Sequence, residues 1–328
     1  MNKRRKLVIA LAVGALTLPL RAYGQQQGKV WRIGFIWGQS RATAQADIDS
    51  ILRGMRELGY VEGRDFTTEY RWADGNTKLL PAMAAEIVRL KVDLIVTRGT
   101  PVALAVKSAT REIPVVFSSV SDPVETGIVS TLARPGANLT GWSNMLPDTS
   151  GKLLELLKAM VPRMSRLAVV ADPGNAGKAL EVKLLQKAVE RLGLPLRSIE
   201  LRTASDIDSA FAQMSLERTN ALIVLADGVT TTNQRRIVEL AAKHRLPAIY
   251  QFREFVDAGG LISYGMNLSR QMERIAIYVD KIFKGAKPAD LPVEQPTTFE
   301  LVINSKAANA LGLMIPESLR ISADKLIE

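Results

Sequence analysis

Short apolar runs alternate along most of the chain with longer segments in which apolar residues recur every three or four positions. Residues 30–37 form the first run, and Ile48, Ile51 and Met55 follow at helical spacing before Gly59. The short runs predict buried strands, and the spacing of the longer segments predicts amphipathic helices. Because the runs are apolar at consecutive positions, both faces of each strand must be covered. This indicates a parallel sheet with helices on both sides.

This order of elements occurs twice in the sequence. A helix that ends in Leu-Gly, a strand of three aliphatic residues and a strand with proline at its second position each have a counterpart further along the chain. The matched segments are 58–59 and 192–193, 94–96 and 222–224, and 113–117 and 246–250. Their offsets are 134, 128 and 133 residues, which predicts two similar doubly wound parallel-sheet lobes of the α/β class.

The two lobes are expected to share the chain in separate pieces and to be joined by a hinge. We assign residues 29–141 and about 265–290 to the N-terminal lobe, and 142–264 and about 291–312 to the C-terminal lobe. Residues 313–328 are expected to form a C-terminal tail. Ligands of doubly wound sheets bind beyond the carboxyl ends of the strands, so two facing lobes predict one cleft between them.

In the first lobe, five polar or aromatic residues follow predicted strands and are candidates for ligand binding. They are Trp37, Gln39, Thr100, Ser119 and Asp122. Thr100 begins a helix with proline at its second position, and the free backbone amides of a helix start attract an anion. The indole of Trp37 either stacks on a ring of the ligand or caps the core, and the sequence favours neither.

Five further candidates follow strands in the second lobe. They are Asp172, Asn175, Asp227, Tyr250 and Tyr264. The ten residues together bring hydroxyls, carboxylates and aromatic rings to the predicted cleft. This set suits an amino acid or a similar zwitterion, whose ammonium group would pair with the aspartates and whose carboxylate would meet the helix start. Each aspartate alone is also a common helix cap or turn residue.

The sequence gives little support for catalysis or metal binding. It contains no cysteine and a single histidine, His244, so neither a zinc site nor a histidine-based catalytic triad is expected. We predict no catalytic residue, no metal ligand and no cofactor.

The first 24 residues have the three parts of a secretory signal peptide. Lys3–Lys6 is basic, residues 7–20 carry no charge, and Ala22-Tyr23-Gly24 places small residues where a signal peptidase cleaves. A helix of residues 7–20 spans about 21 Å, which is short of the ~30 Å hydrocarbon core of a membrane. We therefore expect export to the periplasm and cleavage after Gly24. The Arg4-Arg5 pair leaves the twin-arginine route open.

Removal of this segment halves the net charge of the protein. Five of the 43 lysines and arginines lie in the segment, so the formal net charge falls from +10 to +5. The remaining basic residues form no run, and no nucleic-acid partner is expected.

Six stretches of the sequence resemble one protein family. They are residues 57–64, 99–101, 122–123, 132–141, 252–256 and 285–304. From Lys29 to Glu328 the chain resembles the ABC-transporter substrate-binding proteins related to the tryptophan- and tyrosine-binding lipoproteins. The resemblance implies a type I periplasmic-binding-protein fold, a ligand between the lobes, no catalysis and an ABC permease as partner.

Three features depart from the pattern of this family. The loop Asp227–Thr231 differs, Met266 stands where many relatives have proline, and the lipid-bearing cysteine of the lipoproteins is absent. The first two leave the identity of the ligand open, and the third implies a freely diffusing protein. We expect a monomeric periplasmic protein that delivers a small solute to an ABC permease. A ligand-sensing subunit for a membrane receptor and an enzyme that uses cleft carboxylates are the alternatives.

Overall fold

The computed structural model describes residues 29–144 and 146–328 of the chain. Within them, Trp31–Glu328 forms one unit. The predicted signal peptide lies outside the described residues. No helix in the described part of the chain is long and apolar enough to cross a membrane.

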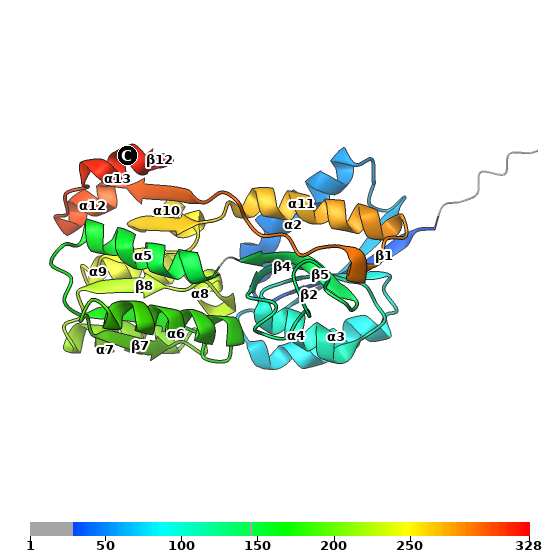
Figure 1. Cartoon of the computed structure of the whole chain (residues 1–328), viewed down its shortest axis with the longest axis horizontal. Helices are drawn as coiled ribbons and strands as arrows, with labels where there is room; N and C mark the ends of the chain where they lie inside the picture. The colour runs from blue at the N-terminus through cyan, green and yellow to red at the C-terminus, as the bar shows by residue number, and fades with distance from the viewer. Residues whose placement is uncertain (1–28, 145) are drawn as a thin grey trace, which may run out of the picture. The chain divides into compact units, whose positions relative to one another are not determined.

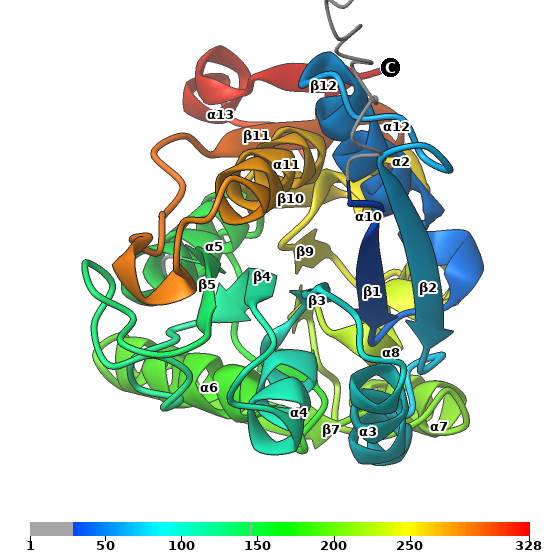
Figure 2. The same cartoon turned by 90° about the vertical axis from the view of Figure 1, so that its right-hand side faces the viewer.

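A five-stranded parallel sheet forms the centre of the first lobe (Figure 1). Its strands are β1 (Trp31–Trp37), β2 (Phe66–Trp72), β3 (Leu94–Arg98), β4 (Val115–Ser121) and β5 (Leu139–Asn144). They lie in the order β2-β1-β3-β4-β5, so the chain reverses its direction across the sheet between β2 and β3. Helices α2 (Arg41–Glu57) and α11 (Leu268–Phe283) cover one face, and α3 (Leu80–Arg89) and α4 (Thr100–Ala109) cover the other (Figure 2).

The second lobe repeats this arrangement in a sheet of seven strands. These are β6 (Leu167–Ala171), β7 (Leu196–Glu200), β8 (Ala221–Val224), β9 (Ala248–Tyr250), β10 (Ile262–Gly265), β11 (Glu300–Asn304) and β12 (Lys325–Ile327). The order β7-β6-β8-β9-β10 reproduces that of the first sheet, and β11 is then added antiparallel to β10. The prediction of two similar doubly wound lobes is therefore confirmed.

Helices cover both faces of the second sheet as well. On one face lie α5 (Leu146–Met160), α6 (Ala176–Glu190), α12 (Ser305–Leu311) and α13 (Glu317–Ser322); on the other lie α7 (Asp206–Leu216), α9 (Gln234–Lys243) and α10 (Arg253–Asp257). The short helix α8 (Gly228–Thr232) begins shortly after β8. Strand β6 shows why the predicted strands are apolar throughout. Leu167, Val169 and Ala171 pack on the first face, and Ala168 and Val170 pack on the second.

Helix α11 comes late in the chain but completes the first lobe. Its Ile275 shares a buried cluster with Ile51 and Met55 of α2. A β-carbon added to Gly54 of α2 would lie 2.6 Å from the carbonyl oxygen of Glu273. The two helices therefore approach as closely as they do because residue 54 has no side chain.

The chain passes between the two sheets three times. The connections lie between β5 and α5, between β10 and α11, and between the short 3₁₀ helix η2 (Pro288–Asp290) and β11. The third connection begins against the first lobe, where the backbone N–H of Ser143 donates to the carbonyl of Glu294 at 2.9 Å. Residues 313–328 contribute α13 and β12, and β12 pairs with β11 at the edge of the second sheet.

Candidate functional site

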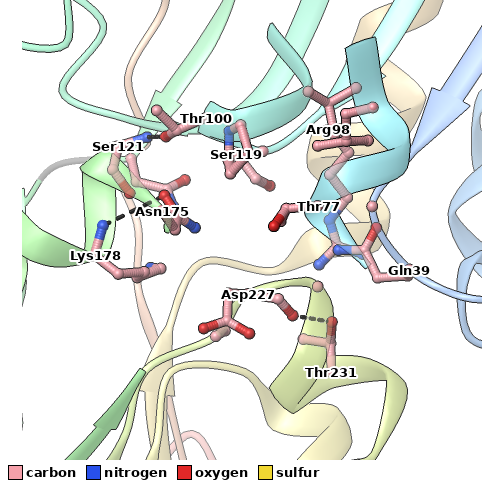
Figure 3. A pocket seen from close by; sticks show the side chains of 18 of the residues that line it. Gln39, Thr77, Arg98, Thr100, Ser119, Ser121, Asn175, Lys178, Asp227 and Thr231 are labelled. Carbon is pink, nitrogen blue, oxygen red and sulfur yellow. Dashed lines mark hydrogen bonds between the residues drawn. The ribbon is translucent and has the colours of Figure 1, made fainter. Parts of the chain in front are cut away.

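A small polar cavity lies at the carboxyl ends of the strands, where the two lobes face each other (Figure 3). Its volume of about 40 Å³ accommodates a few water molecules. Both lobes supply its polar side chains, among them Gln39, Thr77, Arg98, Thr100, Ser119, Ser121, Asn175, Lys178, Asp227 and Thr231. The cavity lies at the cleft that the strand order predicts for a ligand.

Five of the ten residues selected from the sequence line this cavity. They are Gln39, Thr100, Ser119, Asn175 and Asp227. Thr100 begins α4, and its hydroxyl accepts a hydrogen bond from the backbone N–H of Ser121 at 3.0 Å. The side-chain oxygen of Asn175 caps the start of α6. Both of these helix starts, one from each lobe, therefore face the same space.

The three aromatic candidates do not line the cavity. Trp37 is fully buried in the cluster that includes α2. Tyr250 is 1% exposed and stacks on Phe255 with 4.8 Å between the ring centroids. Tyr264 stacks on Phe299 at 5.5 Å. Trp37 and Tyr250 end their strands and Tyr264 lies within β10, and each ring packs against another aromatic ring: Phe35, Phe255 and Phe299 respectively.

The remaining two candidates, Asp122 and Asp172, serve as local turn and backbone partners. The carboxylate of Asp122 accepts a hydrogen bond from the N–H of Glu125 at 3.0 Å, and Asp122 does not line the cavity. The carboxylate of Asp172 accepts from the N–H of Gly174 at 2.8 Å. The backbone N–H of Asp172 in turn donates to a carboxylate oxygen of Asp227 at 2.8 Å, so Asp172 supports the cavity from outside it.

A buried network that sequence reasoning missed connects the lobes beside the cavity. Glu181 of α6 is fully buried, and its carboxylate accepts from Lys178 Nζ at 2.6 Å, Gln251 Nε2 at 2.5 Å and Ser121 Oγ at 3.0 Å. Ser121 belongs to the first lobe, whereas the other three residues belong to the second. Lys178 Nζ also donates to Gln251 Oε1 at 3.1 Å, which leaves one of its three N–H groups for the cavity that it lines.

A second buried ion pair stands on the first-lobe side of the cavity. Arg98 and Asp47 are 4% and 7% exposed and form a direct salt bridge. Trp37 Nε1 donates to the same carboxylate at 3.4 Å. The guanidinium of Arg98 also lies 5.4 Å from the ring centroid of Phe252, a residue of the second lobe.

Asp227 has a different environment from these paired charges. One carboxylate oxygen accepts from the backbone N–H of Thr230 at 2.8 Å, which caps α8, and the other accepts from the N–H of Asp172. Burial raises the pKa of Asp227 above its ordinary value, although these hydrogen bonds and the charge of Lys178 oppose the increase. Within residues 29–144 and 146–328, no lysine, arginine or histidine forms a salt bridge with Asp227.

Two amide side chains at the cavity have unused hydrogen-bonding capacity. The Oε1 atom of Gln39 and the Oδ1 atom of Asn144 are buried and have no hydrogen-bond partner in the described part of the chain. Both residues line the cavity. A buried acceptor without a partner costs free energy, which a donor on a bound molecule would recover.

The lobes meet closely at two glycines. A β-carbon added to Gly177 of α6 would lie 2.5 Å from the Ser121 β-carbon and 2.7 Å from the Thr100 hydroxyl. One added to Gly228 would lie 3.0 Å from the carbonyl oxygen of Gly38. Each contact joins one lobe to the other. Because neither glycine has a side chain, the lobes can approach closely enough to leave only a small cavity.

The arrangement offers binding groups and no metal site among the residues described. No cluster of three or more histidine, cysteine, aspartate or glutamate side chains suited to a metal ion is found within 29–144 and 146–328. The cavity presents hydroxyl and ammonium donors together with amide and carboxylate acceptors. Such a set can hold a small molecule that carries both an acceptor and a donor group.

Comparison with known proteins gives consistent matches over nearly the whole described chain. Residues 34–327 match the family model described as ABC transporter substrate binding protein. A tyrosine-binding protein of Clostridioides difficile is 24% identical over 275 residues, which are 84% of this chain and 77% of the relative.

Two solved structures resemble the fold closely. A conserved domain protein of Vibrio cholerae is 28% identical with a TM-score of 0.85, covering 91% of this chain and 100% of that chain. An ABC domain of Streptococcus pneumoniae in complex with L-Trp is 26% identical with a TM-score of 0.84, again covering 91% of this chain and 100% of that chain.

Proposed function

Because this chain belongs to the family of ABC transporter substrate-binding proteins, we propose that its inter-lobe cavity binds an amino acid or a similar zwitterion. The protein captures a small solute and delivers it to an ABC transporter, as its family does.

The charge of Asp227 carries the proposal. Among the side chains that the structure describes, three ionisable ones line the cavity: Arg98, Lys178 and Asp227. The two cations have carboxylate partners of their own, whereas Asp227 is buried and receives only hydrogen bonds from neutral donors. A buried charge without an opposite charge is unfavourable. The ammonium group of a solute supplies the missing opposite charge.

The opposite end of a zwitterion also has suitable partners. The hydroxyl of Thr100 stands at the start of α4, where helix amides favour an anion, and the remaining N–H of Lys178, in the first turn of α6, lines the same cavity. A solute carboxylate placed there would lie on the Lys178 side of the cavity, away from Gln39 and Arg98 (Figure 3). The unpaired oxygen of Gln39 would then be left for a donor of the solute.

The named relatives suggest which amino acids to test first. One is called a tyrosine-binding protein, and another has L-Trp bound. Leu80, Val102 and Phe252 give the cavity an apolar wall against which a side chain can pack. A cavity of about 40 Å³ is too small for either amino acid, so the lobes must separate to admit the solute, and the side chains that line the cavity must rearrange as the lobes close on it.

The experiment is a calorimetric titration of L-tyrosine and L-tryptophan into the wild type and Asp227→Asn. Removing a charge-assisted hydrogen bond in a desolvated site costs about 1.5–3 kcal/mol, so the affinity should fall roughly 10- to 150-fold. Asp206→Asn is the control. Asp206 accepts backbone hydrogen bonds from Arg202 and Thr203 at an exposed helix start, so this substitution should leave affinity unchanged.

A solute analogue separates the ammonium interaction from general damage. Deaminated tyrosine lacks the ammonium group, so its affinity should be low and should not fall further in Asp227→Asn. Equal tyrosine affinity in the wild type and Asp227→Asn would contradict the ammonium pairing. Absence of binding by both amino acids would contradict the proposed class of solute.

The remaining features of the proposal concern where and how the protein acts. We propose that it works in the periplasm as a freely diffusing monomer after cleavage behind Gly24, with no catalytic turnover and no nucleic-acid partner. The pattern of residues 1–24 and the single histidine support this view. The protein isolated from the periplasm should begin at Gln25, and the bound solute should be recovered chemically unchanged.

A further inference from the structure

A second and larger pocket lies where the chain crosses between the lobes. Its volume is about 420 Å³. Two of the three connections contribute to its lining, with Met266 and Asn267 between β10 and α11 and residues 294–298 before β11, and Trp142 lines it from strand β5 itself. The later two connections run between the two sheets, with α11 beginning at the crossing (Figure 1). We call this space the crossover pocket. It does not share a lining residue with the inter-lobe cavity.

The crossover pocket is positively charged. Arg270 and Arg274 line it from the first two turns of α11, where the free amides of the helix start add to the positive potential. Glu294, the one acidic lining residue among those described, is paired with Arg274 at 2.6 Å. Arg270 is exposed and forms no salt bridge with any residue of the described ranges. One cationic charge in the lining is therefore not compensated.

Two buried N–H donors of the lining have no partner in the described part of the chain. The indole Nε1 of Trp142 and the amide Nε2 of Gln271 are both unpaired, and these side chains are only 8% and 3% exposed. The guanidinium of Arg274 lies 5.1 Å from the ring centroid of Trp142. A buried donor without a partner is unfavourable, so both nitrogens favour an occupant that brings acceptors.

We propose that the crossover pocket binds a small oxyanion, a carboxylate or a phosphate, and that its occupancy raises the affinity of the inter-lobe cavity for solute. The oxyanion accepts hydrogen bonds from the indole and amide nitrogens and pairs with Arg270. The binding site itself is independent of the proposed solute, whereas the change in solute affinity rests on the proposed function.

Gln271 provides the physical connection between the two sites. Its Oε1 accepts a hydrogen bond from Ser119 Oγ at 3.1 Å, and Ser119 lines the inter-lobe cavity. Ser119 has φ of 52°, a conformation rare for serine, where the pairing of β4 with β5 shifts between Phe117 and Val120. An anion bound by Gln271 therefore restrains the side chain that accepts the hydrogen bond of Ser119, a residue with a strained backbone that lines the cavity.

The direction of the effect follows from the conformation in which the pocket is formed. Opening of the lobes must change the three connections, because they are the only covalent links between the sheets in the described ranges. An anion that contacts the two later connections and Trp142 of β5 favours the present arrangement, in which the cavity is small. Linkage is reciprocal, so the anion raises the affinity for solute by the same factor by which solute raises the affinity for the anion.

The first experiment titrates the purified, solute-free protein with succinate and separately with inorganic phosphate, at constant ionic strength maintained with chloride. Saturable heat in the wild type is expected, and which of the two anions gives the tighter binding identifies the source of the oxyanion. Arg270→Gln should weaken binding roughly tenfold or more. Trp142→Phe keeps a ring but removes the N–H group, and it should weaken binding as well. Arg235→Gln, an exposed residue of α9 outside the pocket, is the matched control and should bind like the wild type.

Absence of saturable binding by either anion, or equal binding in Arg270→Gln and Arg235→Gln, would overturn the site. The second experiment measures the affinity for L-tyrosine and L-tryptophan with the anion at saturation and with chloride alone. Tighter solute binding with the anion is expected, and equal affinity would overturn the coupling. Because the first titration uses solute-free protein, its outcome is independent of whether the solute is an amino acid.

Discussion

Gly177→Ala is the sharpest test of the contact between the lobes. The new β-carbon would lie 2.5 Å from the β-carbon of Ser121, whereas ordinary contacts begin at 3.4 Å. The lobes would therefore have to separate by about 1 Å in the closed arrangement. Such a shift would also stretch the 3.0 Å hydrogen bond from Ser121 to Glu181.

The expected magnitude follows from the cost of overpacking. An extra methyl group in a well-packed contact costs about 1–3 kcal/mol, and here the cost falls only on the closed state. Solute affinity should therefore decrease roughly 5- to 150-fold. The second lobe by itself should not be destabilised, because Gly177 lies in the first turn of α6 and alanine is favoured over glycine in a helix by up to about 1 kcal/mol.

The assay compares calorimetric affinity for solute with the Tm of the solute-free protein. Gly151→Ala is the matched control, since Gly151 lies in helix α5 and an added β-carbon would meet no atom within 4 Å. This control should keep the affinity and leave Tm equal or higher. The reasoning is refuted if Gly177→Ala binds solute as tightly as the wild type does. It is also refuted if Gly177→Ala loses Tm without solute, because the clash would then act within the folded solute-free protein.

Two further predictions concern stability. Arg98→Gln should lower the free energy of unfolding by about 3–5 kcal/mol in urea titrations, because it leaves the buried carboxylate of Asp47 without its cation. The control is Arg236→Gln, which breaks an exposed ion pair with Asp208 and should lower the free energy of unfolding by at most about 1 kcal/mol. Burial, helped by the hydrogen bond to Asp280, raises the pKa of Tyr60 from 10.0 to about 12. The folded protein then holds a proton that the unfolded chain loses, so stability should fall as the pH rises from about 10 to about 12. Unfolding measured at about pH 9 and about pH 11 should show a smaller decrease in Tyr60→Phe than in the wild type, and an equal decrease would contradict the role of this phenol.

The sequence predicts the backbone of the site better than its side chains. The end of a strand can be found from its apolar run, but neighbouring residues there point in opposite directions. Tyr250 was selected because it ends a strand, yet its ring packs in the core, and the next residue, Gln251, joins the network of Glu181. Likewise Asp122 caps a turn, whereas the preceding Ser121 lines the cavity.

The buried ion pairs cannot be predicted from the sequence, for a different reason. Lys178 and Glu181 have the i, i+3 spacing of an ordinary solvent-exposed pair on a helix. They are buried because Ser121 and Gln251, which lie 60 and 70 residues from Glu181, cover them. Arg98 and Asp47 are likewise 51 residues apart. Local periodicity contains no information about such partners, so the charges that shape the cavity emerge only from the tertiary structure.

The late position of α11 in the chain has a consequence for the order of folding. The apolar face of α2 is covered by a helix that begins more than 200 residues later, and the second sheet receives β11 and β12 from the last 29 residues. Neither lobe can complete its core while a ribosome is still producing the middle of the chain. Contacts so distant in sequence form slowly, because a large loop must close before they are made. The connectivity therefore delays the completion of both lobes until synthesis is nearly finished.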